Sequence, residues 1–235
     1  MIKQLIKDLQ EASSEERSKT SQRFFKTGKG EYGEGDIFIG LTMPDLRRIS
    51  GKYTNLNLVK VQELLNSKIH EHRMSALVIL VNKYKKGNER EKENIFGFYL
   101  KNAKKINNWD LVDISCPNIV GEFLYRNKEH RKILYELARS DNLWEKRISM
   151  VSMLYFIKYG DFEDPLALAE ILLEERYDLM HKAVGWILRE IGKKDVDVLK
   201  KFLKYHYKNI PRTTLRYSIE RFPEEERKKY LLGNI

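Results

Sequence analysis

The sequence contains little of what disulfide-rich, membrane-spanning and β-sheet proteins require. Its single cysteine, Cys116, excludes an internal disulfide framework and is typical of a reducing cytoplasm, where we expect the protein to reside. The longest apolar run, residues 76–81, is far too short to span a bilayer, and the charged start at residues 2–9 lacks the apolar core of a signal peptide. Runs with the period of two that strands require are scarce. These absences predict an all-α protein without a membrane partner.

The sequence also offers little to hold a metal or a nucleotide cofactor. None of the five histidines has a cysteine partner or the HExxH spacing, and His70 and His72 are two positions apart, so their side chains diverge on a helix. The glycine-rich residues 28–36 match the GxGxxG pattern of dinucleotide-binding loops. A helical pattern and not a strand precedes them, however, and their acidic side chains would repel phosphate. We therefore expect no metal and no cofactor.

Positive charge is in excess, with 44 Lys and Arg against 34 Asp and Glu and a formal net charge of +10. Such a chain attracts polyanions, although a solvated lysine-rich surface explains basic composition equally simply. With 235 residues, 42% of them hydrophobic, it can bury a full core as one elongated domain or two small ones. We predict a single domain over residues 1–235, with N-terminal helices and the glycine-rich loop in residues 1–52 and stacked helix pairs in residues 53–235.

A repeat becomes visible when the apolar helical stretches are compared. Four of them follow a cation, at spacings of 34 and 35 residues and of 74, or two steps of 37: Arg73, Arg147, Lys182 and Arg216. Helix pairs of this length are HEAT-like, and such pairs stack into a solenoid whose second helices line the concave side. We predict a curved, all-α HEAT-like helical-repeat solenoid with a concave basic groove. The missing step falls on Asp110, where the central repeat contributes an acid and a tryptophan instead.

Two short stretches combine tryptophan with charged side chains. If Asn108 is the N-cap of a helix, Trp109 and Asp113 lie one turn apart on the same face. In the second stretch, one helix face carries two cations and a tryptophan: Lys182, Trp186 and Arg189. An isolated Trp–Asp pair is more often a core tryptophan beside a solvated carboxylate. The two stretches together indicate a candidate site.

At these residues the chain resembles the AlkD-type DNA alkylation repair glycosylases, a family built from HEAT-like helical repeats. The resemblance covers essentially the whole chain, and it is carried by Arg23-Phe24-Phe25-Lys26, Pro44-Asp45-Leu46-Arg47-Arg48, Trp109-Asp110-Leu111-Val112-Asp113, Trp144-Glu145-Lys146-Arg147 and Gly185-Trp186-Ile187-Leu188-Arg189-Glu190. Members remove cationic alkylated purines from duplex DNA. The resemblance implies double-stranded DNA with alkylated bases as the partner, no obligatory protein partner, and association with the nucleoid if the source is bacterial.

The resemblance also implies roles for single residues. Asp113 would be the catalytic carboxylate, and Trp109 and Trp186 would line the cleft against the deoxyribose of the lesion. Arg147 and Arg189 would hold phosphates. The full set of DNA-contacting residues expected from the repeat and the resemblance is Arg147, Arg189, Lys182, Arg216, Arg73, Phe24 and Arg47. Some members have a tyrosine where Phe24 aligns, so we expect no hydroxyl contact to the DNA backbone there.

The expected chemistry follows from the charge of the lesion. A purine alkylated at N3 or N7 is a cation that leaves without protonation, while a carboxylate stabilises the oxocarbenium-like sugar. We therefore predict a hydrolase of base excision repair, a monofunctional glycosylase for bases of the 7-methylguanine and 3-methyladenine type. The resemblance adds that no base pocket is required, unlike in most glycosylases. Two alternatives stay open: a helical-repeat protein that binds DNA without excision, and a protein-interaction scaffold.

Overall fold

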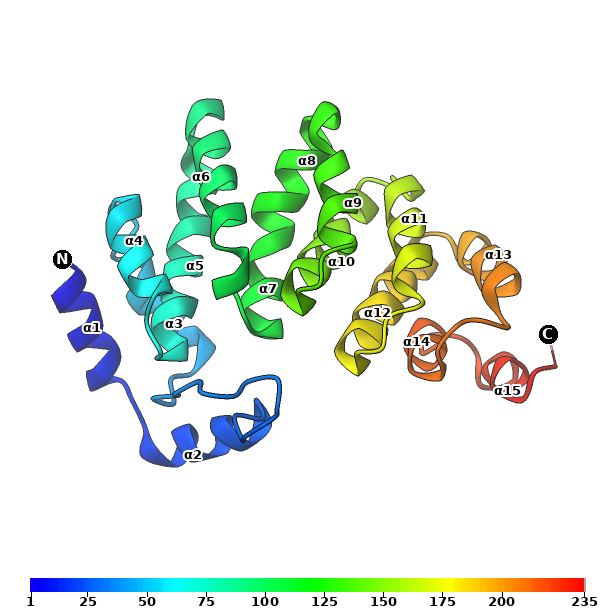
Figure 1. The fold of residues 1–235 in the computed structure, drawn as a ribbon, viewed down its shortest axis with the longest axis horizontal. Helices are drawn as coiled ribbons and strands as arrows, with labels where there is room; N and C mark the ends of the chain where they lie inside the picture. Colours follow the sequence, from blue (N-terminus) through cyan, green and yellow to red (C-terminus); the bar gives the residue numbers. More distant parts are fainter. Residues whose placement is uncertain (235) are drawn as a thin grey trace. The chain divides into compact units, whose positions relative to one another are not determined.

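The computed structural model describes residues 1–234 and consists of helices (Figure 1). Most connections are short, and the long one covers residues 25–42. Among these residues the only β pairing is an isolated bridge between Ile37 and Ile69, and no described helix is both long and apolar enough to cross a membrane. The predicted all-α helical-repeat class is confirmed. Contacts divide the chain into a first unit, residues 1–119, and a second unit from residue 120 onward. The single domain, the curvature and the concave groove stay predictions.

The first unit is organised around one long buried helix. Its α-helices are α1 (Ile2–Glu11), α2 (Glu15–Phe24), α3 (Met43–Gly51), α4 (Leu58–Leu65), α5 (His70–Lys86), α6 (Glu89–Lys101) and α7 (Trp109–Cys116). Helix α5 packs against α3, α4, α6 and α7, and it is buried from its first residue to Val81. Thr42 caps α3 as its sequence pattern predicts, with the hydroxyl oxygen accepting from the backbone N–H of Asp45. Short non-α turns, η1 (Ala103–Lys105) and η2 (Pro117–Gly121), flank α7.

The second unit is also a series of packed helices. Its helices are α8 (Glu122–Arg126), η3 (Lys128–His130), α9 (Lys132–Ala138), α10 (Leu143–Lys158), α11 (Glu163–Leu172), α12 (Asp178–Lys194), α13 (Val196–His206), α14 (Arg212–Ser218) and α15 (Glu224–Leu232). Helix α10 packs against α9, α11 and α12, and α12 packs most closely against α14. Trp144, in the first turn of α10, is buried, as are most of the other apolar residues of that helix. The core of this unit therefore lies between α10, α12 and their partners.

The sequence repeat corresponds to one position in successive helices. The fifth residues of α3, α7, α10, α12 and α14 are Arg47, Asp113, Arg147, Lys182 and Arg216. Arg73 is the fourth residue of α5, one position from the same register. In α7 the equivalent residue is Asp113 and not Asp110, so the step assigned to Asp110 from the sequence is three residues early. Five similar helices thus carry cations at the place where α7 carries a carboxylate.

Gly185 allows α12 and α14 to approach closely. A Cβ at this position would lie 2.5 Å from Cβ of Tyr217 and 2.6 Å from the backbone oxygen of Thr214. We expect Gly185→Ala to lower the free energy of unfolding by about 1–3 kcal/mol, because α14 must move away. Gly97→Ala in α6, where the added Cβ meets open space, should raise it by about 0.4–1 kcal/mol. Urea denaturation measures both, and equal effects would contradict a close approach at Gly185.

Candidate functional site

The candidate site of the first unit is built on the first turn of α7. Asn108 is fully buried and is the N-cap expected from the sequence, because its Oδ1 accepts a hydrogen bond from the backbone N–H of Trp109 at 2.8 Å. Trp109 therefore begins the helix, and Asp113 lies one turn later on the same face. Both side chains are half-buried, so each presents part of its surface to solvent. The expected N-cap and spacing are confirmed, while the catalytic roles stay predictions.

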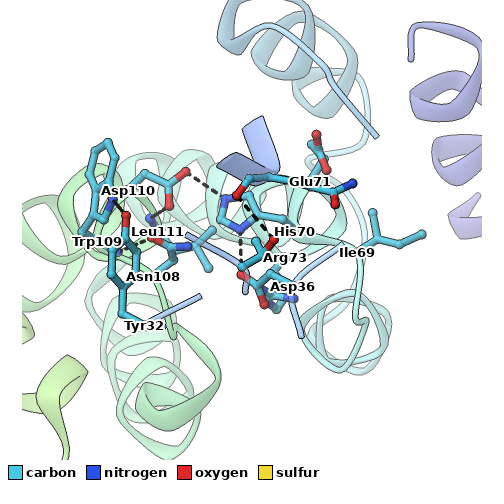
Figure 2. Close-up of polar contacts among 12 residues, drawn as sticks. Tyr32, Asp36, Ile69, His70, Glu71, Arg73, Asn108, Trp109, Asp110 and Leu111 are labelled. Atoms are coloured by element: carbon cyan, nitrogen blue, oxygen red, sulfur yellow. Dashed lines mark hydrogen bonds and ion pairs between the residues drawn. The ribbon is translucent and has the colours of Figure 1, made fainter. Parts of the chain in front are cut away.

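The indole of Trp109 is held by aromatic residues from the N-terminal part of the chain. Its Nε1–H donates to the hydroxyl oxygen of Tyr32 at 3.2 Å (Figure 2). Its ring stacks on Phe25 with 5.2 Å between centroids. Phe24 meets the indole edge-on at 5.9 Å and is 63% exposed. Trp109 is thus a fixed, partly exposed ring and not a core residue. Sequence reasoning missed Tyr32, for which a lone tyrosine within residues 28–36 was the only signal.

Four charged side chains form a buried cluster behind the first turn of α7: Asp36, His70, Arg73 and Asp110 (Figure 2). His70 Nε2 lies 2.8 Å from Oδ2 of Asp110, and Nδ1 lies 3.3 Å from Oδ2 of Asp36. Burial disfavours charge on the imidazole, but the Asp110 and Asp36 carboxylates outweigh it and raise the pKa of His70. Burial likewise opposes charge on Asp36, but His70 and Arg73 outweigh it and lower the pKa of that carboxyl. The cluster therefore holds two cations and two anions.

Arg73 is buried in this cluster, so the expectation that it points into a groove is wrong. Its side chain is 5% exposed, its Nη2 lies 2.7 Å from Oδ2 of Asp36, and its Nη1 donates to the backbone oxygen of Ser67 at 2.9 Å. The repeat gave Arg73 its helical register, but it could not reveal a partner 37 positions earlier in the chain. In the folded protein, Arg73 ties the loop that ends at Asp36 to α5.

Arg147 is a second predicted phosphate contact that the structure places mostly inside. Only 5% of the residue is exposed, and its Nη1 donates to the backbone oxygen of Leu179 at 2.8 Å. This bond joins α10 to the first turn of α12 within the second unit. The expectation of a solvent-facing cation at this repeat position is therefore wrong, because its hydrogen bond holds the guanidinium against the neighbouring helix.

The face of α12 predicted from the sequence is present on the surface of the second unit. Trp186 is half-buried, as expected for a residue that is not part of the core. Lys182, one turn earlier, forms an ion pair with Asp178 at 2.8 Å, and its hydrogen bond lowers the pKa of that carboxyl. Arg189, nearly one turn later, bonds to Glu220. Both cations are thus at the surface, each already beside a carboxylate.

Arg47 and Arg216 are the predicted DNA-contacting cations that remain exposed with no ion-pair partner among residues 1–234.

Arg47 also borders a cavity of about 370 Å³ on the faces of α3, α5 and α7. Its lining combines aliphatic side chains with polar ones: Val78, Val81 and Ile114, and Arg47, Asn82, Lys85 and Asn118. Within residues 1–234, no carboxylate lines this cavity. Sequence reasoning missed Lys85 and Asn82, since only the packing of three helices brings them beside Arg47.

These features define an all-α helical-repeat protein with a tryptophan and a carboxylate on one helical turn. Residues 5–222 match the family model described as DNA alkylation repair enzyme, and the chain belongs to that family. The membership gives it a role in DNA repair, with DNA as its partner.

Among solved structures the chain is similar to a predicted DNA alkylation repair enzyme from Enterococcus faecalis, with a TM-score of 0.71 and 13% sequence identity. The similarity covers 90% of this chain and 97% of that chain. This likeness shows the fold. A comparison with curated proteins found no match.

Proposed function

We propose that this DNA repair protein is a monofunctional glycosylase of the cytoplasm, with HEAT-like helix pairs, which excises cationic alkylated purines from duplex DNA. The observation that carries the proposal is the pairing on α7 of a half-buried carboxylate, Asp113, with an indole that Phe25 and Tyr32 hold in place. A carboxylate and an electron-rich ring on one accessible face favour positive charge that develops in a bound sugar.

The proposed hydrolysis of the bond between base and sugar requires only a carboxylate and an electron-rich ring beside the sugar. In a purine alkylated at N3 or N7, the bond from the sugar C1′ to the base breaks with its electron pair going to the base, which becomes neutral. The sugar acquires oxocarbenium character, and Asp113 stabilises that charge while water adds to C1′ and releases a proton. A neutral alkylated base would first need a proton, so it should be a poor substrate.

Direct transfer of the alkyl group to the protein is disfavoured by the position of its only thiol. Cys116 has no exposed surface, so a methyl group on DNA cannot reach its sulfur without unfolding of α7. The thiolate is the nucleophilic form of cysteine, and reactive cysteines lie in partly exposed positions. Excision of the whole base therefore fits the structure better than methyl transfer to cysteine.

The test is incubation of the protein with duplexes that carry 7-methylguanine, 3-methyladenine or the neutral lesion O6-methylguanine. Chromatography should show free base from the first two above spontaneous depurination, and none from the third. A DNA-binding protein without excision would bind all three duplexes and release nothing. A protein-interaction scaffold would also lack steep salt-dependent binding to DNA.

We further propose that the cavity beside Arg47 binds a phosphate of the DNA backbone in the first unit. Arg47 and Lys85 give its lining two positive charges, no carboxylate among residues 1–234 lines it, and Asn82 adds an amide donor. Ile114, which follows Asp113 directly, also lines the cavity. A phosphate held there would lie on the same set of helices as the proposed carboxylate.

Lys85 and Lys86 provide a matched pair that tests this phosphate site. They are adjacent on α5 and both exposed, but Lys86 borders a different cavity. Lys85→Ala should reduce the slope of log Kd against log salt concentration by about one unit, whereas Lys86→Ala should leave it unchanged. Duplex binding measured by fluorescence anisotropy at several salt concentrations gives both slopes. Equal slopes for the two variants would remove this cavity from the DNA interface.

A further inference from the structure

His70 is the first residue of α5 and is 2% exposed. Both of its ring nitrogens face carboxylate oxygens, and an ionised carboxylate only accepts hydrogen bonds. Both nitrogens must therefore carry protons for both contacts to form, which makes the ring an imidazolium. Arg73 supplies a second positive charge beside Asp36, so two cations and two anions are buried together. Buried charges are tolerated when they are paired in this way.

One contact of His70 reaches the start of α7 directly. Asp110, whose Oδ2 faces Nε2 of His70, follows Trp109 in the chain, and its Oδ1 accepts from the backbone N–H of Leu111 at 2.8 Å. The carboxylate thus connects the imidazolium to the first turn of α7 (Figure 2). Rotation or fraying of that turn would break the bond to His70.

Other contacts of His70 lead to the indole of Trp109 through Phe25 and through the glycine-rich loop. Phe25 lies against both rings, with its centroid 5.4 Å from that of His70 and 5.2 Å from that of Trp109. Asp36, which faces Nδ1, ends the glycine-rich loop that carries Tyr32, the acceptor of the indole N–H. The imidazolium therefore fixes both the helix from which Trp109 projects and the loop that holds its ring.

We propose that His70 is a positioning residue of the excision reaction, which bridges Asp36 and Asp110 and so holds Trp109 and Asp113 in place at the start of α7. This inference rests on the proposed glycosylase function. His70 does not contact the DNA in it, since the ring is buried, and it acts through the residues on α7.

The charge of His70 gives the proposal a pH signature. The charged groups that face the ring are Asp110 from α7, Asp36 from the loop before α3 and Arg73 from its own helix. The uncharged rings of Phe25 and Phe38 also lie against it. Burial opposes charge on the ring, but Asp110 and Asp36 raise the pKa of His70, so the imidazolium persists to higher pH than that of an ordinary histidine. Its stabilising effect is complete below the ordinary pKa of histidine and is lost as pH rises through the raised pKa. Excision should fall as pH rises over that same range.

Two variants of His70 separate positioning from general stability. The amide nitrogen of Asn can replace Nδ1, while that of Gln can replace Nε2, so His70→Gln keeps a donor for Asp110 and His70→Asn does not. We expect His70→Asn to lower the single-turnover excision rate on the order of 10²-fold with unchanged duplex Kd, and His70→Gln to retain most of it. Both should lose the fall in excision with rising pH. Equal losses in the two variants, in proportion to their unfolded fractions in thermal melts, would overturn the proposal.

A spectroscopic measurement does not depend on excision. The indole N–H resonance of Trp109, assigned with Trp109→Phe in ¹⁵N-labelled protein, should shift with pH in step with the ring of His70. If the wild-type protein releases no base, the proposed glycosylase function fails, and this titration still decides whether His70 controls the indole. If base is released but the resonance does not follow His70, the positioning role is wrong while the glycosylase function stands.

Discussion

Asp113→Asn is expected to leave the fold and duplex binding intact and to lower base excision on the order of 10²-fold or more. The amide has nearly the size of the carboxylate, and Asp113 is only half-buried, so the packing of α7 should not change. The negative charge that would stabilise the oxocarbenium-like sugar is lost. Binding of undamaged duplex should become slightly tighter, because one charge that repels phosphates is removed. Single-turnover release of base and duplex Kd, measured on the same preparation, report both effects.

Asp141→Asn is the matched control for this variant. Asp141 is exposed, has no ion-pair partner among residues 1–234, and loses the same charge in the same substitution. It should excise bases at the wild-type rate. If the Asp113 variant also released 7-methylguanine at the wild-type rate, after subtraction of spontaneous depurination, the carboxylate on α7 would be structural and the proposed mechanism wrong.

Arg73→Ala is expected to lower the free energy of unfolding by about 3–5 kcal/mol, the usual cost of removing one partner from a buried ion pair. The substitution leaves Asp36 buried with only His70 as a charged partner. A DNA contact made by Arg73 would have the opposite signature, a smaller salt slope with little change in stability. Urea denaturation and the salt dependence of duplex binding distinguish the two roles.

Two further variants make the Arg73 result specific. Arg216→Ala removes an exposed cation and should change stability by no more than about 0.5 kcal/mol. The double variant Arg73→Ala with Asp36→Asn also removes the charge of Asp36, the carboxylate that Arg73 neutralises. Its loss of unfolding free energy should therefore be smaller than the sum of the losses in the two single variants. Additive losses would show that Arg73 and Asp36 do not stabilise each other.

Local sequence signals were sufficient for most of the fold. The helical spacing of apolar residues and the caps at Thr42 and Asn108 involve residues within four positions of one another, so the order of the chain contains them. The repeat also gave the register of the cations. Equal spacing between Arg73 and Arg147 predicts the central repeat position at Asp110, whereas the structure has it at Asp113. The non-α turns on both sides of α7 make the two intervals unequal.

The surroundings of the candidate site could not be predicted in the same way. The bond between Trp109 and Tyr32 joins residues 77 positions apart, and His70 lies 40 positions from Asp110. No periodicity relates such residues, since tertiary packing alone brings them together. For the same reason the sequence predicts that Arg73, a charged residue, lies at the surface. In the structure the carboxylate of Asp36, 37 positions away, pairs with it in the interior.

The most direct test of glycosylase function is the mass of a methylated strand after incubation with the wild-type protein. Monofunctional excision predicts a loss equal to one whole 7-methylguanine, with an abasic site in an unbroken strand and one free base for each site formed. Recovery of a strand in which guanine replaces the methylated base would show direct reversal, and an unchanged strand under conditions of full duplex binding would show a protein that binds without excision. Either result would contradict the proposal that this chain is a DNA glycosylase.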